Sequence, residues 1–395
     1  MQHQGPHFLQ IPGPSPVPDR VLRAMDRQVI DHRGPAFAVL GKEVLAGIKT
    51  LFQTTQPVII YPSSGTGAWE AAIVNVLAAG DKVLMVETGH FAALWKKMAE
   101  RFQIEVDYIP GDWRHGCDPA QIEAKLVEDK GHKIKAVMVV HNETSTGALS
   151  NIPNIRKAID NANHPALLLV DAISSLGSAE YKHDEWGADV TVTSSQKGLM
   201  LPPGLGFNAV SEKAFAAARA NKTPRSYWDW EDMLAPNAAG YFPSTPATNL
   251  LWGLREVIAM IHEEGLDNLF ARHQKMAAAT RKAVEAWGLE IVCLDKPNYS
   301  PILTGVMMPP GHNAEAFRKI ALDNFNISLG MGLGKLGGKA FRIGHLGDIN
   351  PLMLIGALGG VEMGLSMAGV PFRAGGVQAA MCALEEDRPG NALKA

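Results

Sequence analysis

Apolar and polar positions follow a repeating pattern along residues 55–210. Short aliphatic runs are each followed by a turn rich in Gly, Ser or Thr, and then by a stretch with apolar residues at helical spacing. This alternation predicts an α/β fold with a mostly parallel sheet flanked by helices. The strand candidates are residues 58–61, 83–86, 136–140, 166–170 and 189–193.

The pattern changes after residue 240. Long amphipathic helices are expected over residues 250–261 and 266–287. We expect these helices to bridge to a smaller C-terminal α+β domain. Strand candidates in that domain are residues 289–293, 302–307, 327–329 and 341–344.

The predicted organisation has three parts. We expect residues 1–20 to form an extended N-terminal arm, 21–265 a large domain, and 266–395 the small domain. The Pro-rich stretch 11–16 cannot be helical, so we expect it to lie extended over the body of the protein.

Composition agrees with an enzyme-sized globular chain. With 395 residues, of which 46% are hydrophobic and 19% charged, the chain can bury a large core and divide into two domains. Its net charge is -3 and it has no long basic run, which argues against a nucleic-acid partner. No apolar segment is long enough for a membrane span, and the N-terminus lacks the features of a signal peptide.

The cysteines indicate a reducing compartment. Cys117, Cys293 and Cys382 are far apart, with no CxxC and no Cys/His pair at metal-ligand spacing. We therefore expect neither a disulfide framework nor a metal site, and a cytoplasmic location.

Two polar residues follow apolar strands in a suggestive way. Asp171 ends one strand candidate and Lys197 follows another, 26 positions later. Ligands of open parallel sheets bind outside the carboxyl ends of the strands, so both side chains should face one crevice. Pyridoxal phosphate (PLP) chemistry requires such a pair, a lysine for the aldehyde and a carboxylate for the pyridine nitrogen. Alternatively, Asp171 is an ordinary turn residue after a strand and Lys197 an ordinary surface lysine.

Other motifs have alternatives of their own. The loop 64–67, Ser-Gly-Thr-Gly before a helix, suits a phosphate, or is a hydroxyl N-cap with a tight turn. Arg342 on a likely strand suits a carboxylate, or forms a structural salt bridge. Phe91 presents an aromatic face to a ring, or packs in the core. The GxGxxG match at 332–337 does not join a βαβ unit, so we interpret it as a glycine loop near Arg342, and His141 as a hydrogen-bonded structural histidine.

Together these motifs resemble the class V aminotransferases of PLP fold type I, most closely the serine–glyoxylate and alanine–glyoxylate aminotransferases. The resemblance covers nearly the whole chain, in six motifs that occur in order. It implies a large domain with a mostly parallel seven-stranded sheet and a smaller α+β domain. The motifs lie at residues 12–15, 64–67, 141–147, 170–175, 195–198 and 341–344.

The resemblance also implies roles. Lys197 would carry the cofactor PLP as a Schiff base and move the proton, and Asp171 would pair with the pyridine nitrogen. Arg342 would bind the α-carboxylate of the substrates. The remaining cofactor contacts would be Ser64, Gly65, Thr66 and Gln196 at the phosphate, Phe91 on the ring and Thr144 near the ring hydroxyl.

Family members are homodimers in which a neighbouring subunit completes the phosphate site. The segment 241–246 matches that element, so Tyr241 and Thr245 are expected to contact the phosphate of the other subunit. The tyrosine register is uncertain by one position, because Phe242 can occupy the aromatic place.

The implied reaction is ping-pong transfer of an amino group from a small L-amino acid to glyoxylate, giving glycine and a 2-keto acid. Phenylalanine at the stacking position favours serine as donor, with alanine or aspartate as alternatives, and Arg33 is a candidate for further anion contacts. Two other hypotheses stay open. One is a PLP lyase or desulfurase of the same fold, and the other is a non-catalytic binding protein.

Overall fold

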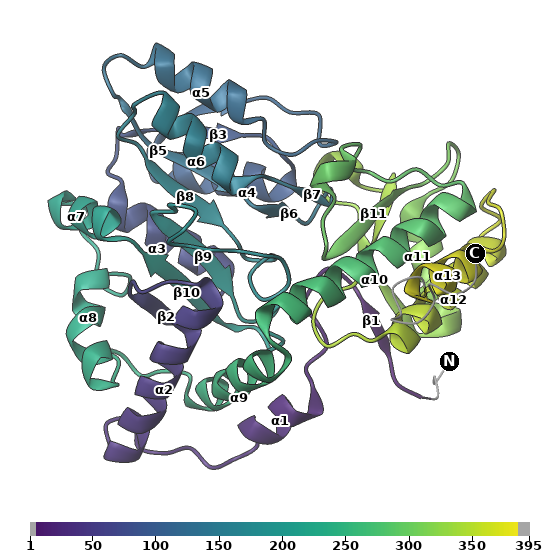
Figure 1. The fold of residues 1–395 in the computed structure, drawn as a ribbon, viewed down its shortest axis with the longest axis horizontal. Coiled ribbons are helices and arrows are strands. Elements are labelled where there is room, and N and C mark those ends of the chain that lie inside the picture. Colours follow the sequence, from purple (N-terminus) through teal and green to yellow (C-terminus); the bar gives the residue numbers. More distant parts are fainter. Residues whose placement is uncertain (1–4, 386–395) are drawn as a thin grey trace, which may run out of the picture.

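Seven strands form the central sheet in the larger part of the computed structural model, which describes residues 5–385 (Figure 1). The spatial order is β2-β10-β9-β8-β5-β3-β4, and β10 alone runs antiparallel to its neighbours. The predicted mostly parallel seven-stranded sheet is confirmed. The bounds are β2 Val58–Ser63, β3 Lys82–Val86, β4 Glu105–Ile109, β5 Ile134–Val140, β8 Leu167–Asp171, β9 Val190–Ser194 and β10 Gly204–Val210.

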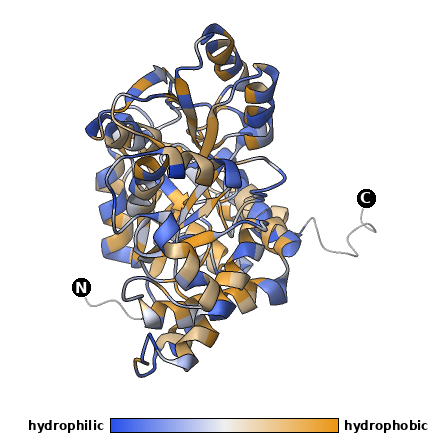
Figure 2. Cartoon of the chain, turned by 90° about the vertical axis from the view of Figure 1, so that its left-hand side faces the viewer, coloured by the Kyte–Doolittle hydropathy of each residue, from blue (hydrophilic) through white to orange (hydrophobic). Residues whose placement is uncertain are grey.

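Helices cover both faces of this sheet because successive strand side chains point to opposite sides. Ile60 of β2 packs in one apolar cluster with α2, α5, α6 and α9, whereas Ile59 packs in a second cluster with α3, α4, α7 and α8. Figure 2 shows apolar strands inside and hydrophilic outer helix faces. The bounds are α2 Pro35–Phe52, α3 Gly65–Val76, α4 His90–Arg101, α5 Pro119–Glu128, α6 Ile152–Asn161, α7 Glu212–Ala220, α8 Trp230–Ala239 and α9 Thr248–Glu264.

A second sheet of four strands has the order β1-β12-β13-β11 and carries its own apolar cluster. Its strands are β1 Phe8–Gln10, β11 Leu303–Met307, β12 Ile327–Met331 and β13 Ala340–Gly344. The helices packed with it are α10 Leu266–Trp287, α11 Ala314–Phe325, α12 Pro351–Met367 and α13 Gly376–Glu385. The strand pairs β12–β13 and β11–β13 are antiparallel.

The N-terminal arm is not a plain extended segment throughout, contrary to the prediction, because it contains a paired strand and the start of a helix. Its residues Phe8–Gln10 pair in parallel with β12, and the helix α1 Asp19–Met25 begins before residue 21. Residues 11–16 lie in no helix or strand, as expected for the Pro-rich stretch, and run across the body between the two sheets.

The expected strand over residues 289–293 is wrong in extent. That segment forms one isolated bridge, Ile291 to Val306 on β11, supported by the Val292 N–H donating to the Gly305 carbonyl at 2.9 Å. The chain then leaves the sheet edge, because the Leu294 N–H donates to the Arg114 carbonyl at 2.8 Å. A competing backbone partner in the larger part thus ends the pairing.

The proposed domain boundaries stay a prediction. Residues 1–4 of the arm and 386–395 of the small domain lie outside the described residues. Gly265, with φ at 81°, separates α9 from α10 at the predicted second boundary. Within residues 5–385, no helix combines the length and the apolar character needed to cross a membrane.

A pair of helix glycines tests the packing of α2. Alanine normally stabilises a helix relative to glycine by up to ~1 kcal/mol. At Gly41, however, a Cβ would lie 2.0 Å from the carbonyl oxygen of Gly240, at the end of α8. Gly41→Ala should therefore lower the apparent Tm by several degrees, at ~1–3 kcal/mol for overpacking. Gly359→Ala in α12, where a Cβ meets nothing within 4 Å, is the matched control and should not lower it.

Candidate active site

Polar residues that follow strands of the large sheet and the short strand β6 line one cavity. Its volume is about 150 Å³. Asp171 ends β8, Lys197 follows β9, and Thr144 follows the short strand β6 Asn142–Glu143. The lining residues are Ser64, Gly65, Thr66, Trp69, Phe91, Leu94, Asn142, Thr144, Asp171, Ile173, Ser174, Gln196 and Lys197.

The side chain of Lys197 lines this cavity. Its Nζ donates a hydrogen bond to the carbonyl oxygen of Pro12 at 2.8 Å. Burial lowers the pKa of Lys197 to about 8, and the positive charge of Arg342 contributes in the same direction. A substantial neutral fraction near neutral pH suits an amine that acts as nucleophile or base.

Asp171 is a buried carboxylate, with 4% of its surface exposed. Its Oδ1 accepts a hydrogen bond from the Ile173 N–H at 2.7 Å, as a turn aspartate would. Burial nevertheless raises the pKa of Asp171 to about 7, and the carboxylate of Glu143 adds to the shift. A positively charged group in the cavity would stabilise the ionised form, which a purely structural turn does not require.

The loop before α3 leaves its hydroxyl groups available. Ser64 occupies the N-cap position, yet its side chain makes no capping hydrogen bond, so the N-cap alternative is not what the structure shows. Ser64 and Thr66 are exposed at the cavity. Gly65 is packed so closely that a Cβ would lie 2.4 Å from Cδ1 of Ile173. The N-terminus of α3, these hydroxyls and the backbone N–H groups form a site suited to an anion.

Arg342 does not line the cavity but adjoins it. Its Nη1 donates to the Thr144 carbonyl at 2.7 Å, and its Nε donates to the Met331 carbonyl at 2.8 Å. It makes no salt bridge among the described residues, so the structural ion-pair alternative fails. Burial lowers the pKa of Arg342 to about 10, which leaves the guanidinium charged at neutral pH, and the carboxylate of Glu143 acts on it electrostatically.

Glu143 organises the wall that carries Phe91, and the sequence reasoning assigned it no role. This fully buried carboxylate accepts hydrogen bonds from the N–H groups of Phe91 and Ala92, both at 3.1 Å, at the start of α4. Its other oxygen accepts from the Ser145 hydroxyl at 2.6 Å. A carboxylate at a helix N-terminus is favourable, so Glu143 holds α4 and thereby Phe91 at the cavity.

Further residues at the cavity were not predicted as site residues. The indole of Trp69 lies beside the Asp171 carboxylate, whose pKa it lowers, and the Oδ1 of Asn142 has no hydrogen-bond partner among the described residues. Asn142 Nδ2 donates to the Ser174 hydroxyl at 2.9 Å. Asn142 lies inside a motif that sequence analysis did single out, whereas the approach of Pro12 to Lys197 has no local signal.

Tyr241 and Thr245 are not brought to this cavity. The Tyr241 N–H donates to the Pro236 carbonyl at 2.8 Å, and Thr245 is exposed on the surface after α8. Arg33 is also exposed and is not among the lining residues. Of the predicted phosphate contacts, the loop 64–66 and Gln196 line the cavity of this chain, and Oε1 of Gln196 has no partner within residues 5–385.

The interpretation of His141 as structural is confirmed. It is buried, and its Nδ1 lies 2.9 Å from the Ser175 hydroxyl. Burial lowers the pKa of His141 to about 3, so the ring is neutral. Among the described residues, no group of three or more His, Cys, Asp or Glu side chains could hold a metal ion.

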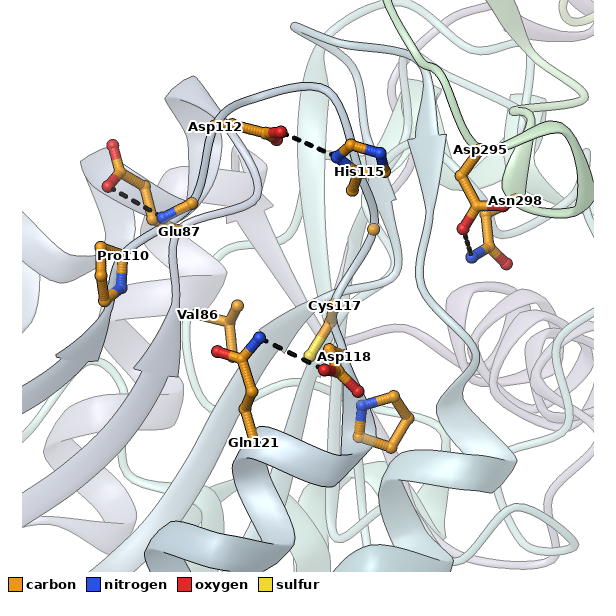
Figure 3. Close-up of a pocket in the computed structure, with 13 residues that line it drawn as sticks. Val86, Glu87, Pro110, Asp112, His115, Cys117, Asp118, Gln121, Asp295 and Asn298 are labelled. Atoms are coloured by element: carbon orange, nitrogen blue, oxygen red, sulfur yellow. Dashed lines mark hydrogen bonds and ion pairs between the residues drawn. The ribbon is translucent and has the colours of Figure 1, made fainter.

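A larger hollow of about 810 Å³ lies between residues 110–121 and the segment 295–298 (Figure 3). Its lining includes the carboxylates of Glu87, Asp112, Asp118 and Asp295 and contains neither lysine nor arginine. It does not suit an anion, so the smaller cavity is the better candidate for catalysis.

Comparisons with known proteins agree with this geometry. The family model described as aminotransferase class-V matches residues 7–333. The chain is 48% identical over 391 residues to serine–glyoxylate aminotransferase of Methylorubrum extorquens, covering 97% of each chain. It is 42% identical to L-aspartate–glyoxylate aminotransferase of Paracoccus denitrificans, covering 96% of each.

Among solved structures, the pyridoxamine–pyruvate aminotransferase of Mesorhizobium loti superposes with a TM-score of 0.91. The sequence identity is 29%, over 98% of this chain and 99% of that one. A cysteine desulfurase of Thermococcus onnurineus superposes with a TM-score of 0.71 at 18% identity, over 90% and 93% of the two chains, and shows a shared fold alone.

The lowered pKa of Lys197 can be measured directly in protein prepared without PLP. Reductive methylation of Lys197, followed by peptide mass spectrometry, should have a midpoint near pH 8, against about 10.4 for an ordinary lysine. Asp171 raises this pKa, so Asp171→Asn should move the midpoint lower, whereas Asp323→Asn on the exposed side of α11 should not. An unshifted midpoint near pH 10 would contradict the electrostatics described above.

Proposed function

The chain belongs to the class V aminotransferases, and from this premise we propose that it transfers the amino group of a small L-amino acid, serine favoured, to glyoxylate. As a family member of PLP fold type I, it is a PLP-dependent aminotransferase. The sequence-based expectation of a transaminase is thereby confirmed. Residue roles, donor and assembly are proposals argued from the site.

The residues of the cavity fit PLP. Asp171 is a buried carboxylate that needs a positive partner, which a protonated pyridine nitrogen provides. The free Ser64 hydroxyl and the N-terminus of α3 suit the phosphate, and the unpartnered Gln196 side chain lies beside them in the lining. Phe91 would cover the ring and Thr144 would lie near its hydroxyl. PLP, when bound, accepts the electron pair released as the substrate Cα–H bond breaks.

Lys197 and Arg342 would perform the remaining steps. Arg342 binds the α-carboxylate that donor and acceptor share, because it is charged and its own hydrogen bonds go to backbone carbonyls. Lys197 would be the residue that holds PLP covalently, and its Nζ would move the proton at the substrate Cα. A pKa of about 8 gives Nζ a larger neutral fraction near neutral pH than an ordinary lysine has, while Nζ stays basic enough to accept a proton. The same groups serve glyoxylate in the reverse half-reaction, which yields glycine.

Two observations support serine as the donor. The relatives named serine–glyoxylate aminotransferase are 44–48% identical to this chain, and the one named for L-aspartate is 42% identical. An aspartate donor also carries a second carboxylate, and Lys197 is the single cation among the lining residues of the cavity. A neutral hydroxymethyl side chain avoids that uncompensated charge.

The desulfurase alternative lacks its nucleophile. That chemistry needs a mobile cysteine at the substrate, and none of the three lies in the lining of the cavity. Cys117 and Cys293 are buried, and burial raises the pKa of the Cys293 thiol to about 11. A non-catalytic binding role is disfavoured by the intact Lys197, Asp171 and Arg342.

We also propose a cytoplasmic homodimer with shared sites. Val29 and Val39 are 73% and 58% exposed, which is apolar surface of the kind that a second subunit covers. The segment 241–245 follows Gly240, which is packed against Ala38 of α2 on this side of the molecule. Three unpaired cysteines agree with a reducing compartment.

A donor panel tests the proposed reaction. Wild-type protein with PLP and glyoxylate should form glycine fastest with serine, and more slowly with alanine or aspartate. Lys197→Ala should lose the visible absorbance of the lysine-bound cofactor and at least about 10³-fold in turnover, since it removes nucleophile and base together. Lys319→Ala, in an exposed ion pair on α11, is the matched control. Glycine from no donor, with other keto acids accepted, would refute glyoxylate as the acceptor.

The shared phosphate site predicts a remote effect on cofactor affinity. Thr245→Ala should raise the Kd for PLP about tenfold, because a hydrogen bond to a charged group contributes ~1.5–3 kcal/mol. Ser244→Ala, at the neighbouring exposed position, should leave it unchanged. Fluorescence titration measures the Kd for PLP, and sedimentation measures whether the protein is a monomer or a dimer. A monomer with full PLP affinity, insensitive to Thr245→Ala, would exclude the proposed assembly.

A further inference from the structure

The loop between β12 and β13 reaches from the four-stranded sheet to the larger part of the protein. Lys335 at its tip forms an ion pair with Glu87, which directly follows β3. The Lys335 Nζ also lies 5.2 Å from the centre of the Trp113 ring, a cation–π geometry. The sequence analysis noted the glycine spacing of this loop and assigned no function to it.

Hydrogen bonds from neighbouring groups hold the Glu87 carboxylate in this ion pair. Its Oε1 also accepts a hydrogen bond from the Trp113 indole N–H at 2.8 Å, and the Gly111 N–H approaches Oε2 at 3.4 Å. Figure 3 shows Glu87 and Asp112 on the rim of the larger hollow. Burial acts against the charged form of Glu87, yet Lys335, Trp113 and Gly111 together hold its pKa below the usual value. The carboxylate is therefore ionised at neutral pH and available to Lys335.

The backbone of Trp113 has a conformation that residues other than glycine rarely adopt. Its φ is 64°, in the left-handed region, and the residue is buried, with 4% of its surface exposed. It is the one residue of the larger part in a small apolar cluster whose other members are Val292, Leu336 and Ala340 of the smaller part. An unfavourable backbone at a junction of this kind points to a constraint imposed by function.

The loop touches both walls of the active site. A Cβ on Gly334 would lie 2.7 Å from Cη2 of Trp113 and 3.2 Å from Nδ1 of His90, the neighbour of Phe91. At the start of the loop, the Met331 carbonyl accepts the hydrogen bond from Arg342 Nε. The loop thus links the element carrying Phe91 to the carbonyl that orients Arg342.

We propose that Glu87, Trp113 and Lys335 form an interdomain clasp, and that Lys335 is a positioning residue for binding of the substrate carboxylate. The clasp holds the loop against α4, so that the guanidinium of Arg342 and the ring of Phe91 keep a fixed separation. None of the three clasp residues lines the cavity. This inference rests on the proposed role of Arg342 in the transamination.

Substitution of Lys335 separates positioning from structure. Lys335→Met keeps the apolar stem but removes the charge, and should raise KM about fivefold for the amino donor and for glyoxylate alike, with kcat within twofold. Both KM values should rise because the two substrates share the carboxylate that Arg342 binds. Lys335→Arg keeps the charge and should restore KM, and Lys319→Met, which breaks the exposed pair with Asp323, is the matched control.

Hydrogen exchange reads the clasp without any substrate. Mass spectrometry of the PLP-bound protein should show backbone amides of residues 332–340 exchanging about fivefold faster in Lys335→Met than in wild type. In Lys319→Met their exchange rate should equal that of wild type. Unaltered exchange would refute the clasp. Faster exchange with both KM values unaltered would refute the positioning role. If wild type forms no glycine from any donor, the proposed reaction fails, and exchange still decides whether the clasp exists.

Discussion

Removal of water from two opposite charges is the constraint on which this structure depends. Burial lowers the pKa of Lys197 to about 8 and raises that of Asp171 to about 7. Both shifts cost free energy unless a ligand supplies the missing partners. The lining of the cavity combines hydroxyls and a helix N-terminus with this buried carboxylate. Burial of these two side chains thus lowers the free energy of unfolding, and it also gives them the shifted pKa values that suit reactive groups.

Buried polar groups outside the cavity keep this arrangement in place. Glu143 satisfies the first N–H groups of α4 and so sets the position of Phe91. The backbone carbonyls of Thr144, in the turn after β6, and of Met331, at the end of β12, orient Arg342. Carbonyl acceptors neutralise no charge, so the guanidinium stays positively charged and can attract a carboxylate, with the buried Glu143 carboxylate acting on it electrostatically. The substrate end of the site is thus assembled by contacts between the two parts of the chain.

Much of this could be predicted from local patterns. The alternation of Ile59 and Ile60 between two apolar clusters follows from the period of a strand, and the parallel order places Asp171 and Lys197 at one edge. The strand over 289–293 was overpredicted because its apolar run matches a strand, whereas the Arg114 carbonyl, distant in sequence, ends the pairing. Trp69 at the cavity has no comparable signal, since periodicity reports which face of a helix is buried and not what that face adjoins.

The sequence by itself determined the sheet, the residue types at its strand ends and the family, because these depend on periodicity and on short motifs. Tertiary structure alone decided what surrounds them. The Pro12 carbonyl on Lys197, the buried carboxylate of Glu143 under Phe91 and the pair between Glu87 and Lys335 join residues 52–248 positions apart. Such contacts leave no local pattern, since their free energy arises only when folding brings the partners together and removes water around them.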